Sequence, residues 1–199
     1  MSRDWPPILE RGVAGLTYEG EGRSGDVAVF APRERGGLLA AIDGLGHGHP
    51  AADAAEAAAE VVRGYADDAP HELLEACHRA LRATRGAVMT LVWFDVEGLS
   101  MEWTGVGNVE ARLVRAGARP AGPVVLGGVV GFNLPRARVA TVALQPGDLV
   151  VLATDGVAAD FSEAVDPGAP AQQVADHVLE HCAKRTDDAL VAVVRVLAE

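Results

Sequence analysis

Three acidic turns beside apolar runs constrain the fold of this chain more than any other feature of its sequence. Asp43 directly follows a run of five apolar residues, and a second such run leads through Thr154 into Asp155. Asp187 and Asp188 open the apolar run near the end of the sequence. Short apolar runs bounded by turn residues are typical of buried strands. The sequence therefore places three carboxylates at strand ends, where they can converge on one cation pocket.

The turn at Asp43 reads Asp-Gly-Leu-Gly-His-Gly over residues 43–48. Its glycines can adopt positive φ, and they let a ligand approach the main chain closely. An Asp before a Gly is most often a simple turn residue, and that interpretation stays open for each acidic turn taken alone. The turns taken together favour a binding site.

The composition predicts one cytoplasmic domain that spans residues 1–199. The chain is 49% hydrophobic, which is ample for a sizeable core. Its formal charge of -11 argues against a nucleic-acid partner, because phosphate backbones attract clustered Lys and Arg. The sequence has no signal-peptide pattern, and no apolar run approaches the ~20 residues that span a bilayer. We therefore expect no contact with nucleic acid or membrane.

The two cysteines, Cys77 and Cys182, have no CxxC or metal-ligand spacing. We expect neither a disulfide framework nor a zinc site, and both thiols are expected to be buried in separate helices.

The periodicity predicts strands and helices in segregated groups, as in an α+β layered domain. Two of the helices form an αα-hairpin, the first from Pro50 to about Tyr65 and the second starting at Pro70 with Asp68 or Ala69 as its cap. A third helix covers about 170–183. Strands are expected over 12–18, 26–30, 38–42, 88–96, 99–106, 109–115, 138–144, 149–153 and 189–197, mostly in antiparallel pairs.

Carboxylates at strand ends suit hard divalent cations. Mg²⁺ and Mn²⁺ take oxygen ligands from carboxylates, backbone carbonyls and water. Two such ions, roughly 3.5–4 Å apart, can activate a shared water and clamp a phosphoryl group. The acidic turns therefore predict metal-assisted hydrolysis of a phosphate ester.

The ordered set of motifs resembles the metal-dependent serine/threonine phosphatases of the PPM (type 2C) class, and within it the SpoIIE-like branch. The short stand-alone members of stressosome signalling are the most similar in form. The resemblance runs from about Leu16 to the C-terminus, and the motifs that carry it are Gly25-Asp26, Asp43 to Gly48, Gly105-Val106-Gly107-Asn108, Thr154-Asp155-Gly156 and Asp187-Asp188.

The resemblance implies a fold and a set of ligands. The fold would be a PPM-type four-layer α-β-β-α sandwich, with two mainly antiparallel sheets flanked by helices. Two divalent cations, Mn²⁺ or Mg²⁺, would be bridged by Asp43, and the Gly44 carbonyl would join Asp43 at one of them. Asp155 and Asp187 would hold the other ion, and Asp26 would reach the pair from the N-terminal strand.

Other roles stay open within the resemblance. Arg23 is a candidate for contact with the substrate phosphate. His47 either protonates the leaving group or caps the turn. Asp188 could replace Asp187 as a ligand, although adjacent side chains on a strand point to opposite faces. Asn108 is expected to be a turn residue that ties the backbone of its motif.

These expectations describe a metal-dependent phosphoserine/phosphothreonine protein phosphatase. Its implied substrate is a phosphorylated STAS-domain protein of a bacterial sigma-factor or stressosome pathway. The alternative is a catalytically weak module of the same fold that binds a phosphorylated partner without turning it over.

Overall fold

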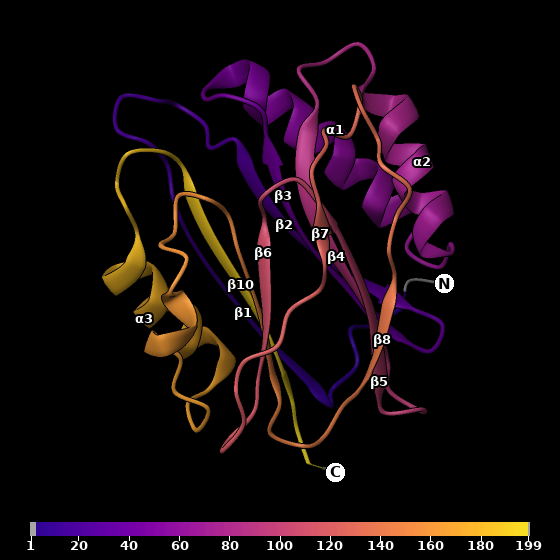
Figure 1. Cartoon of the computed structure of the whole chain (residues 1–199), viewed down its shortest axis with the longest axis vertical. Coiled ribbons are helices and arrows are strands. Elements are labelled where there is room, and N and C mark those ends of the chain that lie inside the picture. The colour runs from indigo at the N-terminus through magenta and orange to yellow at the C-terminus, as the bar shows by residue number, and fades with distance from the viewer. Residues whose placement is uncertain (1–2, 199) are drawn as a thin grey trace.

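Two β-sheets pack face to face and carry helices on their outer faces in the computed structural model, which describes residues 3–198 (Figure 1). This is the α+β sandwich of two mainly antiparallel sheets that the sequence predicts. Within the described residues, no helix is both long enough and apolar enough to cross a membrane.

The first sheet contains the first and the last strand of the described chain. Its strand order is β1-β10-β9-β6, and every neighbouring pair is antiparallel. The N-terminal strand thus pairs along its whole length with the last strand. The strands are β1 (Leu9–Leu16), β6 (Glu110–Val114), β9 (Leu149–Ala153) and β10 (Ala189–Val196).

The second sheet is built from the middle of the chain. Its order is β2-β3-β4-β5-β7, with β8 also paired to β5. The pairs are antiparallel except β5 with β7. The strands are β2 (Asp26–Arg33), β3 (Gly36–Gly44), β4 (Ala87–Asp95), β5 (Ser100–Val106), β7 (Val125–Leu126) and β8 (Ala140–Ala143).

Helices close the sandwich on both sides. The hairpin of α1 (His49–Gly64) and α2 (Pro70–Leu81) covers the second sheet, while α3 (Ala171–Cys182) and the short 3₁₀ helix η1 (Phe161–Ala164) cover the first (Figure 1). Alanines on the inner face of α1 let it approach closely. A methyl group at Gly44 would lie 2.0 Å from the carbonyl oxygen of Ala51, so only glycine fits at this contact.

The core has three apolar layers, one between the sheets and one under each helical face. Strand β3 is buried on both of its sides because it lies inside the second sheet and beneath α1. The layer between the sheets includes Leu39, Val92, Trp103, Leu152 and Val194. The sandwich thus fixes the ends of β2, β3, β9 and β10 relative to one another.

The structure differs from the sequence prediction mainly at short or edge strands. β1 begins at Leu9 rather than at residue 12, because β10 supplies a pairing partner for those extra residues. β8 is confined to Ala140–Ala143, where it pairs with β5. β7 and η1 were not predicted, since two and four residues are too few to show a period. Of the two predicted caps of α2, Asp68 and Ala69, the structure has Ala69.

Cys77 and Cys182 lie in α2 and α3, and both thiols are free. Cys77 is buried as expected, whereas Cys182 is only partly buried. The expectation of burial is therefore wrong for Cys182, which is the last residue of its helix.

Candidate metal centre

Two carboxylates of the second sheet face one another across a strand pair. Asp26 is the first residue of β2, and Asp43 is its direct partner in the antiparallel register with β3. Directly opposed side chains lie on the same face of a sheet, with Cβ atoms about 4.5–5.5 Å apart. Two like charges that face each other in this way destabilise the sheet. A purely structural role would not require such a pair, so its presence favours a functional role.

Two more carboxylates come from the first sheet. Asp155 lies two residues beyond β9, and Asp187 lies two residues before β10. Since β9 and β10 are antiparallel neighbours with Ala153 opposite Val191, these residues meet at the same end of the sheet. The site is therefore assembled from both layers of the sandwich.

A cavity of about 390 Å³ joins the two pairs. Three of the predicted ligands, Asp43, Asp155 and Asp187, line it directly. The remaining wall is mostly backbone and small apolar side chains, from Leu45, Gly46, Val88, Gly107, Asn108, Gly127, Gly128 and Val129. The cavity leaves room for ions, water and a phosphoryl group.

Asp26 is not among the residues that line the cavity; it is buried beside it, with 8% of its surface exposed. Its Oδ2 accepts a hydrogen bond of 2.7 Å from the Thr154 hydroxyl. The backbone at Asp26 is held as well, because its N–H donates to Oγ of Ser24.

The electrostatics of the site favour a bound cation. Burial, together with the neighbouring carboxylates led by Asp26, raises the pKa of Asp43 to about 8. Burial also raises the pKa of Asp26 to about 7, partly opposed by its bond to Thr154. Metal-free protein at neutral pH therefore holds protons on these side chains, and a divalent cation would take their place.

The donor set fits Mg²⁺ or Mn²⁺, because it consists of carboxylates around an open cavity at a glycine-rich turn. Within residues 3–198, no three His, Cys, Asp or Glu side chains are close enough together to hold one ion by themselves. The carboxylates thus surround the cavity without closing on a single position. Mg²⁺ suits such a site, since it usually keeps several waters.

The side chains of the adjacent residues Asp187 and Asp188 lie in different environments. Asp187 lines the cavity. Asp188 is buried, and its two oxygens accept hydrogen bonds from the N–H groups of Tyr18 (2.8 Å) and Gly25 (2.7 Å). Asp188 therefore ties the loop between β1 and β2 to the start of β10, and it is occupied by backbone donors. This favours Asp187 over Asp188 as the ligand.

Arg23 and His47 lie outside the cavity lining. The Arg23 guanidinium pairs with Asp53 of α1 at 2.7 Å, and Nδ1 of His47 lies 2.6 Å from Oε1 of Glu21. Both side chains are largely exposed, so their roles toward substrate stay predictions. Gly44, the proposed carbonyl ligand, ends β3 and donates its N–H to the carbonyl of Gly25 at 2.9 Å.

Sequence reasoning missed three supporting contacts. Asn108 does more than shape a turn, because its side-chain amide donates to Oδ2 of Asp155 at 2.8 Å. The Lys184 ammonium donates to the carbonyl oxygen of Asp155 at 2.6 Å. Thr154 orients Asp26. A signal for Thr154 was present, since a hydroxyl directly before a candidate ligand is well placed to bond at the same site.

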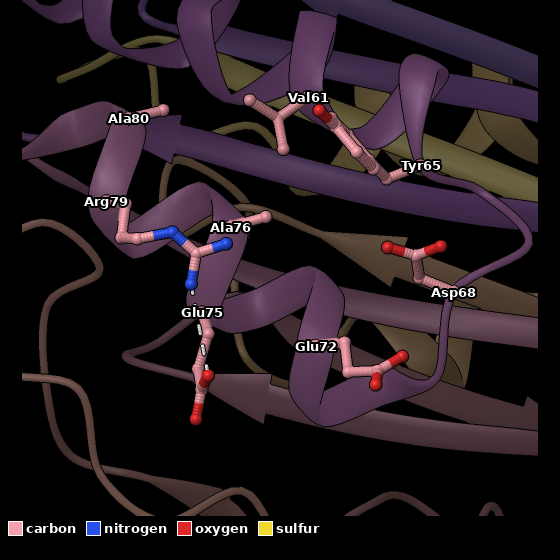
Figure 2. A pocket seen from close by; sticks show the side chains of 8 residues that line it. All are labelled: Val61, Tyr65, Asp68, Glu72, Glu75, Ala76, Arg79 and Ala80. Atoms are coloured by element: carbon pink, nitrogen blue, oxygen red, sulfur yellow. Dashed lines mark ion pairs between the residues drawn. The ribbon is translucent and has the colours of Figure 1, made fainter.

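A larger hollow of about 650 Å³ lies between α1 and α2, as Figure 2 shows. Two of its three acidic side chains have local structural partners: Glu72 accepts from the N–H of Ala69 at the start of α2, and Glu75 pairs with Arg79 at 3.9 Å. No motif of the sequence falls in it. The carboxylate cavity at the strand ends remains the candidate centre.

Comparison with known proteins agrees with the geometry. The phosphoserine phosphatase RsbX of Bacillus subtilis (strain 168) is 23% identical over 174 residues, which is 87% of each chain. A crystal structure of RsbX in complex with magnesium superposes with a TM-score of 0.85 and 22% identity, over 94% of this chain and 95% of that one.

Two further structures have the same fold. A chain described in work on the bacterial stressosome as a modular system superposes with a TM-score of 0.87 and 30% identity, over 94% of this chain and 99% of that one. The catalytic domain of the serine/threonine phosphatase PstP, in complex with two manganese ions, superposes with a TM-score of 0.77 and 18% identity, over 96% and 99%.

The family model of stage II sporulation protein E (SpoIIE) matches residues 34–197, which include Asp43, Asp155 and Asp187. RsbX is thus a relative by sequence, and the serine/threonine phosphatase PstP/Ppp of Mycobacterium tuberculosis has the same fold. The chain belongs to the SpoIIE family of PPM-type phosphatases, and it is similar to RsbX over most of its length.

Proposed function

We propose that this protein is a cytoplasmic, metal-dependent phosphoserine/phosphothreonine protein phosphatase, formed by a single domain over residues 1–199. The observation that carries the proposal is the convergence of Asp43, Asp155 and Asp187, from both sheets, on one cavity. Its relatives include a phosphoserine phosphatase, and relatives of the fold hold magnesium or manganese.

Each carboxylate has a proposed role. Asp43 and the Gly44 carbonyl would hold two divalent ions, Mn²⁺ or Mg²⁺, together with Asp155 and Asp187. The buried Asp26 would support these ligands from its place beside Asp43. Bound divalent ions supply Lewis-acid chemistry, since they lower the pKa of water and offset phosphoryl charge.

The chain's other groups position these ligands. The amide of Asn108 fixes one oxygen of Asp155, which leaves the other oxygen for a cation. The hydroxyl of Thr154 fixes one oxygen of Asp26 in the same way. Preorganised ligands lose little freedom when an ion binds, so these hydrogen bonds support metal affinity.

A phosphoprotein is the substrate class that suits the cavity best. The described residues that line it include no aromatic side chain that could hold the organic part of a small phosphate ester. A phosphoserine side chain is short and brings its own protein surface. Since one relative is RsbX and another belongs to a stressosome system, we propose a phosphorylated STAS-domain protein of a sigma-factor or stressosome pathway as the substrate.

The test is release of phosphate from phosphorylated STAS proteins of the same genome, measured with Mn²⁺, with Mg²⁺ and with EDTA. Turnover that depends on metal and is lost in Asp43→Asn supports the proposal. The control is Asp176→Asn, which removes an exposed carboxylate on α3. Tight binding of the phosphoprotein without turnover in either metal would instead establish the alternative, a catalytically weak binding module.

A further inference from the structure

We propose that Arg85 binds the phosphoryl group of the substrate at the rim of the carboxylate cavity. The inference rests on the proposed function and adds the residue that recognises the anion. Neither sequence motif nor family resemblance pointed to Arg85.

A hydrogen-bonded turn places Arg85 between α2 and β4. The Thr84 hydroxyl donates to the carbonyl of Leu81 at 2.8 Å and accepts from the N–H of Gly86 at 3.0 Å. The carbonyl of Gly86 in turn accepts from the N–H of Leu45 at 3.0 Å. Both neighbours of Arg85 are thus anchored, and one of them is bonded directly to the loop that follows Asp43.

The guanidinium of Arg85 lies against a residue of the cavity wall. Gly46 lines the cavity, and a methyl group added to it would lie 2.7 Å from Nη1 of Arg85. Gly46 also has a φ of 89°, which L side chains rarely adopt. A glycine at this position therefore both shapes the turn and leaves space for the Arg85 guanidinium beside the cavity.

Arg85 is exposed, and within residues 3–198 it has no ion-pair or hydrogen-bond partner. Two other cations near the acidic turns are occupied: Arg23 pairs with Asp53, and the Lys184 ammonium is bonded to the carbonyl of Asp155. All five N–H donors of Arg85 are available to a ligand.

The chemistry of the site calls for such a group. A phosphoryl dianion that approaches Asp43, Asp155 and Asp187 meets like charge wherever bound ions do not offset it. A guanidinium fork can bind two phosphoryl oxygens at once, with charge-assisted hydrogen bonds that an ammonium matches less well. Arg85 would therefore bind and orient the anion at the entrance.

The test compares Arg85→Ala and Arg85→Lys with Arg82→Ala. Arg82 is exposed, lies three positions earlier as the C-cap of α2, and its loss changes the net charge equally. The substrates are a phosphoserine protein and p-nitrophenyl phosphate, both in saturating Mn²⁺. We expect Arg85→Ala to lower kcat/KM by about 10- to 100-fold for both substrates, mainly through KM. Arg85→Lys should recover part of the loss, and Arg82→Ala should match the wild type.

A second readout does not need turnover. Inorganic phosphate is titrated calorimetrically into the Mn²⁺-loaded wild type and into Arg85→Ala, after thermal melts have shown that both are folded. Weaker phosphate binding by the variant, about 10-fold or more, supports the proposal. Equal binding overturns it, and so does failure of the wild type to bind phosphate.

The kinetic results separate this inference from the function on which it rests. A loss confined to the phosphoprotein would mean that Arg85 reads the protein surface and not the phosphoryl group, which overturns the inference. If Arg85→Ala turns over both substrates as fast as the wild type, the inference about Arg85 is overturned, while the proposed phosphatase function stands. A wild type without turnover would defeat the proposed function, and the phosphate titration would then decide the role of Arg85.

Discussion

The hydroxyl of Thr154 donates to Oδ2 of Asp26 at 2.7 Å and at the same time accepts the N–H of Leu190 at 2.9 Å. Because the Leu190 donor occupies the oxygen, the hydroxyl proton is directed at Asp26. Thr154 follows β9 of one sheet, and Asp26 begins β2 of the other. One hydrogen bond thus joins the two sheets at the candidate centre.

Replacing Thr154 by Val should weaken both the fold and metal binding. The change leaves the Leu190 N–H and an Asp26 oxygen without a partner in the core, which costs about 1–3 kcal/mol. It also removes the interaction that lowers the pKa of Asp26, so a cation must displace a more firmly held proton. Urea unfolding and Mn²⁺ titration measure the two effects. Thr154→Ser keeps the hydroxyl and should lie close to the wild type; equal metal affinity in all three proteins would contradict the role of this bond.

Metal should stabilise the protein through Asp43. Divalent ions bind only the folded site, so at ~100 times the dissociation constant one site adds about 2.7 kcal/mol to the free energy of unfolding. Thermal melts in Mn²⁺ and in EDTA should therefore differ for the wild type. Asp43→Asn should melt slightly higher than the wild type in EDTA, because the amide is neutral in its buried position without taking up a proton, and should respond little to Mn²⁺. Identical midpoints for the wild type in Mn²⁺ and EDTA would mean that these carboxylates do not form a metal site.

Substitutions at Asp187 and Asp188 should have different effects, the first on activity and the second on stability. Asp187→Asn should abolish metal-dependent turnover and change the free energy of unfolding little, because Asp187 is partly exposed at the cavity. Asp188→Ala should cost about 1–3 kcal/mol for each backbone N–H that loses its acceptor, at Tyr18 and at Gly25. Denaturant unfolding and phosphate release measure the two variants in parallel. The reverse pattern would show that Asp188 is the ligand.

Metal-free protein should lose stability as the pH rises. The folded-state pKa values of Asp26 and Asp43 are about 7 and about 8, above the ordinary value of 3.8, so the folded protein binds more protons than the unfolded chain between these limits. The contribution of these bound protons to the free energy of unfolding is therefore present at about pH 4 and is lost by about pH 8. Melting temperatures in EDTA should fall over this range, more steeply for the wild type than for Asp43→Asn. Mn²⁺ should reduce the slope, since deprotonated carboxylates bind it better; parallel slopes in the two proteins would argue against a raised pKa at Asp43.

Turnover should not depend on a thiolate. Burial raises the pKa of Cys77 to about 12, so its thiol stays protonated at neutral pH. Neither Cys77 nor Cys182 lines the carboxylate cavity. Cys77→Ala and Cys182→Ser should retain near-wild-type turnover, and iodoacetamide should inhibit neither the wild type nor the variants. Inhibition in step with alkylation of either cysteine would instead indicate a covalent mechanism.

Local pattern was enough to predict most of the fold and the acidic turns. The apolar run before Asp43 is β3, and the run after Asp187 is β10, because buried strands carry apolar residues whatever their partners are. The two-residue strand β7 has no such period. It exists only because β5 offers it an edge, so no local signal could reveal it.

The supporting contacts of the site could not be predicted for a related reason. Asp26 and Thr154 are 128 positions apart, and the two acceptor bonds of Asp188 span 170 and 163 positions. Such pairs become neighbours only when the two sheets pack. The sequence identified acidic residues at strand ends, but it could not show that Asp187 lines the cavity while Asp188 is held by backbone donors.

The pairing of β1 with β10 has a consequence for how the protein is made. β1 is synthesised well before its partner, which is the last strand of the described chain, and Asp187 lies two residues before that strand. Contacts so distant in sequence form late. A nascent chain therefore carries the Asp43 turn for most of its synthesis without a complete set of acidic side chains around it. We expect the catalytic capacity of each molecule to appear in one step, after translation has passed β10.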